Sequence, residues 1–281
     1  MIYTDNDKRK AVVDIMKDIG IGVSVTQRIG MIKQPRGGYL PPSMFREIYL
    51  ESEEYLYPIV LEPEELYPEE NVFPSLVGTA VEYLGKFMAG VPKEEAFRIS
   101  IKGARRIGEE ENAEQLLKEI QNLDENSVKS ALKIATYDTA TRGRIREVIP
   151  TRAINPDKKT IKNAKIMVKR FLSFLDKYGP MVLSGFNFEG GYSETVDRGD
   201  ADFSTADTIW DMKVLRGAIT TKHTLQLLMY WIMGERSVHP ELHNIKHLGI
   251  FNPRKNLVYR INTADIPPKT IQQVEKKVIE Y

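Results

Sequence analysis

Two short motifs near residue 200 carry side chains suited to phosphodiester chemistry. Gly199-Asp200-Ala201-Asp202-Phe203 supplies two carboxylates, and Ile209-Trp210-Asp211-Met212-Lys213 supplies a third carboxylate and a lysine. Apolar residues flank Asp202 and Asp211, which indicates strands rather than exposed turns. Neighbouring strand ends would bring two acids and one ammonium group together. Such a set can hold a divalent cation and direct a water at a phosphodiester.

Asp211 and Lys213 form the stronger part of this pattern. They stand at positions i and i+2 of the predicted strand, so their side chains project on one face. The run Thr208-Ile209-Trp210 precedes Asp211, and Val214-Leu215 follows Lys213. An acid and a lysine inside so apolar a run are costly to bury unless they are paired or bound to a metal. A simple buried ion pair is the alternative interpretation.

Two helices are expected to add polar side chains. Gln226 and Tyr230 lie one turn apart on a predicted helix over 221–233 and face the same way. Glu82 shares a face with Gly78 on a helix entered through Pro74 or Ser75, and the glycine permits a close approach. The alternatives are an amphipathic border for the first pair and an exposed surface position for Glu82.

Together these motifs resemble the PD-(D/E)XK nuclease superfamily, and within it the RecB-like and Cas4-like branch that adds a Gln-x-x-x-Tyr motif. In that family the first acid precedes a bulky apolar residue, which favours Asp202 over Asp200, although both share a strand face. The resemblance implies that Glu82 faces the metal, at a position where the family often has histidine. It also implies that Gln226 and Tyr230 lie beside the active site, where they contact nucleic acid or order a water.

The resemblance therefore implies an Mg²⁺- or Mn²⁺-dependent nuclease, with DNA favoured over RNA and with exonuclease and endonuclease action both open. Asp202, Asp211, the backbone carbonyl of Met212 and Glu82 would hold the cation, because hard ions prefer oxygen ligands. Lys213 would orient the water and stabilise the charge that develops on the phosphoryl oxygens.

Charge is segregated along the chain although the net charge is only +1. Residues 47–85 contain ten Glu and no Lys or Arg, whereas residues 141–177 contain eleven basic and three acidic residues. The basic stretch is expected to follow a nucleic-acid backbone, and two oppositely charged solvated faces are the alternative. The residues expected to contact nucleic acid are Lys222, Arg142, Arg144, Arg146, Lys162, Lys165, Lys169 and Arg170.

The order of predicted elements indicates an α/β fold. Strands are expected over 182–188, 192–196 and 207–215 and in a hairpin over 248–261, with a last helix ending at residue 279. The resemblance implies a restriction-endonuclease-like core, a central mixed sheet flanked by helices, formed by residues 71–90 and 179–281. A helical basic insertion, residues 91–178, interrupts the core, and a helical and acidic N-terminal arm, residues 1–70, precedes it. Within the arm, helices are expected over 8–19 and from Ser43 through Glu47.

The chain has no cysteine, which excludes disulfides, thiolate-held zinc and the iron–sulfur cluster that several RecB-like relatives carry. No apolar run approaches the roughly 18 to 20 residues that span a bilayer, so no membrane association is expected. The polar start of the chain lacks a signal-peptide core. These features indicate a cytoplasmic protein.

Two other functions remain open from the sequence. The same fold would also suit a catalytically inactive nucleic-acid-binding protein, or a regulatory protein whose acidic segment, residues 47–82, covers a partner's DNA-binding surface. A nuclease restrained by its own acidic arm combines these ideas. Repair or recombination, phage biology and phage-related defence all remain open as biological settings, and so does the oligomeric state.

Overall fold

The computed structural model describes residues 22–49 and 64–281 and shows an α/β protein. Its centre is a mixed sheet of six strands in the order β2-β8-β7-β6-β5-β3. Within this sheet β6 and β7 run parallel and the other neighbouring strands are antiparallel, and α10 provides the crossover connection from β6 to β7. The strands of this sheet are β2 (Arg46–Tyr49), β3 (Leu183–Phe186), β5 (Ala201–Ser204), β6 (Thr208–Met212), β7 (His247–Asn252) and β8 (Leu257–Asn262).

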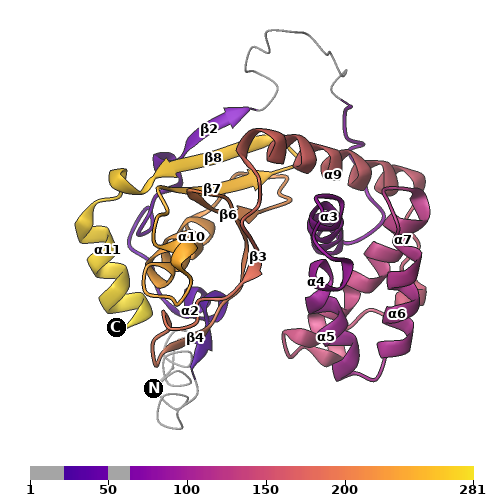
Figure 1. The fold of residues 1–281 in the computed structure, drawn as a ribbon, viewed down its shortest axis with the longest axis horizontal. Coiled ribbons are helices and arrows are strands. Elements are labelled where there is room, and N and C mark those ends of the chain that lie inside the picture. The colour runs from indigo at the N-terminus through magenta and orange to yellow at the C-terminus, as the bar shows by residue number, and fades with distance from the viewer. Residues whose placement is uncertain (1–21, 50–63) are drawn as a thin grey trace, which may run out of the picture.

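Helices cover both faces of the sheet and extend to one side of it (Figure 1). Helices α3 to α7 gather beside the sheet, and α9 crosses from them to the strands. The helices are α2 (Val25–Met31), α3 (Pro74–Met88), α4 (Lys93–Ala96), α5 (Arg98–Arg106), α6 (Glu110–Glu119), α7 (Glu125–Ile134), α8 (Asp138–Thr141), α9 (Lys158–Tyr178), α10 (Thr221–Gly234) and α11 (Pro268–Val274).

Aromatic packing fastens α9 to one face of the sheet. The Phe174 ring stacks on Phe251 with centroids 4.4 Å apart and meets Trp210 edge-on at 4.8 Å. Phe171 meets Phe203 edge-on at 5.4 Å. Such pairs add to the burial of large apolar surfaces. The opposite face is covered by α10, which lies in a second apolar cluster with residues of β6, β7 and β8.

Most predicted elements of the C-terminal half are confirmed. Strands lie at the centres of the predicted segments 182–188 and 207–215, and β7 and β8 form the predicted hairpin. The predicted helix over 221–233 is α10, and the last helix continues from α11 as a π-helical turn to Ile279. Residues 91–178 are largely helical, as expected.

Two predicted elements are wrong. The helix expected from Ser43 is a single 3₁₀ turn followed by β2, because residues 46–49 pair with β8 and tertiary pairing overrides local propensity. The strand expected over 192–196 is a loop up to Val196, where β4 (Val196–Arg198) begins and pairs with β1 (Val23–Ser24). The Tyr192 hydroxyl donates to the carbonyl of Gly199 and accepts from the N–H of Phe188, which closes this loop. The helix expected over 8–19 lies outside the described residues.

The division into arm, core and insertion remains a prediction, and observed contacts cross its boundaries. Strand β2 comes from the predicted arm and completes the central sheet. Helix α3 comes from the predicted core and packs on α9 and α7 of the predicted insertion. Among the described residues, no helix is long and apolar enough to cross a membrane.

Candidate active site

The two predicted acids lie where β5 and β6 separate. Phe203 pairs with Trp210, so the next residues toward the open end are Asp202 and Asp211. In place of a further ladder bond at this end, the N–H of Met212 donates to Oδ2 of Asp202 at 2.6 Å. Where the strands separate, the carboxylate of Asp202 therefore accepts the backbone N–H that has no partner in the ladder. This bond fixes Asp202 next to Asp211. Asp200 is exposed, and its backbone carbonyl accepts a hydrogen bond from a tyrosine hydroxyl of α10.

Asp211 is the most constrained acid of the site. Its side chain is 1% exposed, and Oδ1 accepts a bond from Nζ of Lys213 at 2.8 Å. Burial raises the pKa of Asp211 to about 7; the Lys213 ammonium opposes this rise, and the carboxylates of Asp202 and Glu82 add to it. Its other oxygen, Oδ2, is buried and has no hydrogen-bond partner. A buried carboxylate oxygen without a donor needs a cation, a water or a proton.

Lys213 is held at the end of β6 by its backbone N–H, which donates to the Phe251 carbonyl of β7 at 2.9 Å. Burial favours its neutral amine, but the carboxylates of Asp211 and Asp202 outweigh burial and raise the pKa of Lys213. The side chain therefore stays an ammonium at neutral pH. It can stabilise negative charge, and it cannot act as a general base in that state.

Glu82 reaches the site from α3. Gly78 on the same helix lies against Val214, with space for an ordinary van der Waals contact. Burial first, and then the carboxylate of Asp202, raise the pKa of Glu82, while Lys86 and Lys213 lower it. Glu82 therefore interacts electrostatically with both Asp202 and Lys213. Its Oε1 accepts a bond from Nζ of Lys86 at 2.6 Å, so the carboxylate is turned along its own helix.

The residues present fit a hard divalent cation in part. Asp202 and Asp211 are adjacent carboxylates, and the unpartnered Oδ2 of Asp211 is a donor atom of the kind that Mg²⁺ or Mn²⁺ prefers. The predicted three-carboxylate set is not assembled: among the described residues, no group of three or more His, Asp or Glu side chains is placed to hold a metal ion. Glu82 instead accepts a hydrogen bond from Lys86 of its own helix.

Gln226 and Tyr230, both on α10, lie next to the strand that carries Asp200 and Asp202. Nε2 of Gln226 donates to the Tyr230 hydroxyl at 2.7 Å, and that hydroxyl donates to the Asp200 carbonyl at 2.8 Å. Burial and then the charge of Asp211 raise the pKa of Tyr230 well above its ordinary value. The tyrosine is buried, and its hydroxyl holds the backbone two residues before Asp202. In this structure the pair positions the acidic strand.

His223 is a further neighbour of the site, next to Lys222 at the start of α10. Its Nδ1 accepts a bond from the backbone N–H of Thr220 at 3.1 Å, as part of a capping box at the start of α10. Burial, then the charges of Lys213 and Lys222, lower the pKa of His223 to about 4. The ring is therefore neutral at pH 7. Lys222 itself is exposed at the first turn of α10.

Lys86 is a site residue that sequence reasoning missed. It is buried, and it bonds Glu82 one helical turn earlier. The sequence signal for it was a Glu and a Lys four residues apart on a helix that is otherwise mostly apolar.

The residues predicted to contact nucleic acid lie in three places: at the start of α10, after α8 and on α9. Lys222 begins α10, while Arg142, Arg144 and Arg146 are exposed after α8, where Arg144 pairs with Glu147 at 3.2 Å. The α9 lysines Lys162, Lys165 and Lys169 line a cavity of about 370 Å³ together with Tyr67 and Glu64.

The guanidinium group of Arg170, in contrast, is held by hydrogen bonds within the protein. Its Nη1 donates to the carbonyls of Pro253 and Arg254, and its Nη2 donates to the carbonyl of Glu64. These bonds tie α9 to the turn between β7 and β8. A contact between Arg170 and nucleic acid would have to compete with all three.

Comparison with known proteins identifies no relative. No family model matches the sequence, and no match is found among curated proteins or solved structures. The functional argument therefore depends on the geometry of the site.

Proposed function

We propose that the protein is a metal-dependent nuclease with a restriction-endonuclease-like core, which hydrolyses phosphodiester bonds, with DNA favoured as the substrate. The observation that carries the proposal is the convergence of Asp202, Asp211 and Lys213 where β5 and β6 separate. Glu82 supports it from α3 through its coupling to Asp202. The sheet is mixed: Asp202 and Asp211 come from the antiparallel pair β5 and β6, and β7 runs parallel to β6. This arrangement suits a restriction-endonuclease-like core.

Each residue has a role that follows from its environment. Asp202 and Asp211 would hold Mg²⁺ or Mn²⁺, with the Met212 carbonyl as a further oxygen ligand. When bound, the cation polarises the phosphate and lowers the pKa of a bound water. Lys213 keeps its proton and stabilises the charge on the phosphoryl oxygens. Tyr230 and Gln226 keep the backbone before Asp202 in place.

The test is a cleavage assay on linear, circular and single-stranded DNA and on RNA, with Mg²⁺, Mn²⁺ or EDTA. We expect cleavage only with a metal. Asp211→Ala and Lys213→Ala should each reduce the rate by at least about 100-fold, because each removes charge stabilisation from the transition state. Circular dichroism would check that both variants fold. Activity in EDTA equal to that in Mg²⁺, or full activity in both folded variants, would refute the assignment.

A second function, a nucleic-acid-binding or regulatory protein with the same fold and no catalysis, has one observation in its favour. Lys213 is paired with Asp211 and Lys86 with Glu82, so the charges of the site partly satisfy one another without a ligand. This function predicts metal-independent binding of nucleic acid and no cleavage under any of the conditions above. The two outcomes are mutually exclusive in the same assay.

A further inference from the structure

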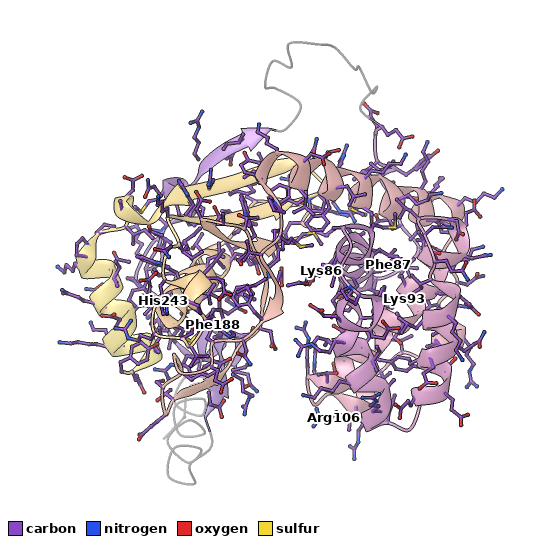
Figure 2. The ribbon with its side chains drawn as sticks, in the orientation of Figure 1. Lys86, Phe87, Lys93, Arg106, Phe188 and His243 are labelled. Atoms are coloured by element: carbon purple, nitrogen blue, oxygen red, sulfur yellow. The ribbon has the colours of Figure 1, made fainter. Side chains whose placement is uncertain are left out.

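Lys86 is a buried cation at the site for which the proposed mechanism has no role. Its side chain is only 6% exposed, and Figure 2 shows it on the side of α3 that is turned toward the strands. An ammonium group has three N–H donors. In the described part of the chain its only hydrogen-bond acceptor is Oε1 of Glu82, at 2.6 Å. A buried ammonium with unused donors is expensive to maintain for structure alone.

The charges around Lys86 belong to the catalytic acids. Burial disfavours its ammonium, but Glu82 and Asp202 outweigh burial, so the pKa of Lys86 is raised. Asp202 also interacts with Lys213. The two lysines therefore interact with the same carboxylates, Lys213 from the end of β6 and Lys86 from α3. Arg98, on α5, adds a further positive charge near Lys86 and donates to the Gly185 carbonyl at 2.8 Å.

The position of Lys86 is fixed by the residue before it. Gly85 lies so close to Phe171 of α9 that an added Cβ would stand 2.4 Å from the ring. Helix α3 therefore cannot rotate or withdraw from α9 without losing this contact. Because Glu82 and Lys86 are one turn apart, the same packing directs both toward the sheet.

We propose that Lys86 is a phosphate-binding residue of the active site, whose ammonium contacts a non-bridging oxygen of the nucleic-acid substrate. The inference rests on the proposed function and identifies the ligand as a backbone phosphodiester. Phosphate competes with Glu82 for Lys86, so substrate binding releases the Glu82 carboxylate toward Asp202 and Asp211. Lys213 and Lys86 then hold the phosphate from two sides.

The test measures binding without cleavage. Anisotropy of a fluorescein-labelled oligodeoxythymidylate is followed in EDTA from about 50 to 200 mM salt. We expect Lys86→Met to weaken binding by about tenfold and to reduce the slope of log K against log salt by roughly 0.7, since one phosphate contact is lost. Lys86→Arg keeps the charge and should retain the slope. Glu82→Gln should tighten binding by about threefold, because the competing carboxylate is neutral.

The Glu82→Gln background separates phosphate binding from a role through Glu82. If Lys86 contacts phosphate, Lys86→Met still weakens binding and lowers the slope in that background. If the effect of Lys86→Met vanishes there, or if the slope never changes, Lys86 only positions Glu82 and the inference is overturned. A wild-type protein that binds no oligonucleotide overturns it too. Lys86→Gln replaces Lys86→Met if thermal unfolding shows that the latter does not fold.

Failure of the proposed function is separately visible. The wild-type protein is assayed in parallel for cleavage with Mg²⁺. Binding with the expected slopes but without cleavage would refute the nuclease and leave Lys86 as a phosphate ligand of a binding protein. Cleavage with slopes that do not depend on Lys86 would refute the inference alone.

Discussion

Asp211 is a residue whose burial opposes folding in the metal-free protein. Its carboxylate is 1% exposed, one of its oxygens lacks a donor, and burial raises its pKa to about 7. The Lys213 ammonium compensates only part of the desolvation. A position selected for stability alone would favour a neutral side chain here. The unpartnered oxygen calls for a cation, a water or a proton, and the proposed function would supply the cation.

Asp211→Asn is expected to stabilise the metal-free protein while it removes cleavage. The folded-state pKa of about 7 lies above the ordinary value of 3.8, so the folded protein holds a proton that the unfolded chain releases between these values. The contribution of Asp211 to the free energy of unfolding therefore falls as the pH rises from about 4 to about 7. The difference in pKa sets an upper limit of about 4 kcal/mol. Because Lys213 loses its partner, we expect a gain of about 1–3 kcal/mol above pH 7.

Urea unfolding in EDTA at a series of pH values measures this effect. The difference between Asp211→Asn and wild type should grow with pH and level off above about pH 7. A matched control is Asp197→Asn, an exposed acid that pairs with Arg198 at 3.2 Å on the surface and should give a small, flat difference. A variant at position 211 that is less stable than wild type at every pH would contradict the argument.

At the scale of elements, the position of α3 determines where Glu82 and Lys86 lie. Two glycines of this helix have different surroundings. A methyl group at Gly85 would collide with the Phe171 ring at 2.4 Å. A methyl group at Gly78 would meet Val214 at 3.5 Å, an ordinary contact. Gly85→Ala should therefore lower the free energy of unfolding by about 1–3 kcal/mol, because overpacking forces α3 away from α9. Gly78→Ala should raise it by about 0.5–1 kcal/mol through helix propensity.

The two variants also separate stability from site geometry. Displacement of α3 should reduce cleavage by Gly85→Ala under conditions where the variant is fully folded, whereas Gly78→Ala should cleave like wild type. Chemical denaturation and initial rates measured on the same preparations provide the comparison. Equal stability and equal activity of the two variants would show that α3 does not depend on the Gly85 contact.

Elements whose pattern is local could be predicted from the sequence, and elements that depend on distant partners could not. Apolar residues around Asp202 and Asp211 identified their strands, and their adjacency follows from the β5–β6 pairing over a short turn. Strand β2 was taken for a helix because its partner, β8, lies near the other end of the chain. The turn of Glu82 toward Lys86 was missed for a related reason. A pair one turn apart on a helix indicates a surface ion pair, and only the packing of α3 makes it a buried one.

At the scale of the whole molecule, the helices beside the sheet and the sheet itself must keep a fixed relation, because Glu82 and the two aspartates come from different sides. Helix α9 provides one connection, through the aromatic contacts of Phe171 and Phe174. The segment before α3 provides another. Asn163 of α9 accepts a bond from the N–H of Tyr67 and donates to its carbonyl. Three residues later, Glu70 pairs with Arg254 in the turn between β7 and β8.

The Glu70–Arg254 pair is expected to be the main electrostatic link between these parts. Arg254 donates through Nη2 to both oxygens of Glu70, at 2.9 and 2.8 Å, and the side chains are 1% and 8% exposed. Glu70→Gln would leave a buried guanidinium without its counter-charge, which costs about 3–5 kcal/mol. The matched control is Glu64→Gln in the same segment. Glu64 is 47% exposed and lies 3.5 Å from Lys169, so its loss should cost less than about 1 kcal/mol.

Urea unfolding and limited proteolysis together test this link. Glu70→Gln should unfold at lower urea and should be cleaved faster between residues 64 and 73, because the segment loses its attachment to the β7–β8 turn. Cleavage of nucleic acid should fall as well, since α3 follows this segment directly and carries Glu82. Glu64→Gln should match wild type in all three measurements. If the two variants behave alike, the buried pair is not what holds α3 against the sheet, and the aromatic contacts of α9 alone must fix the geometry of the site.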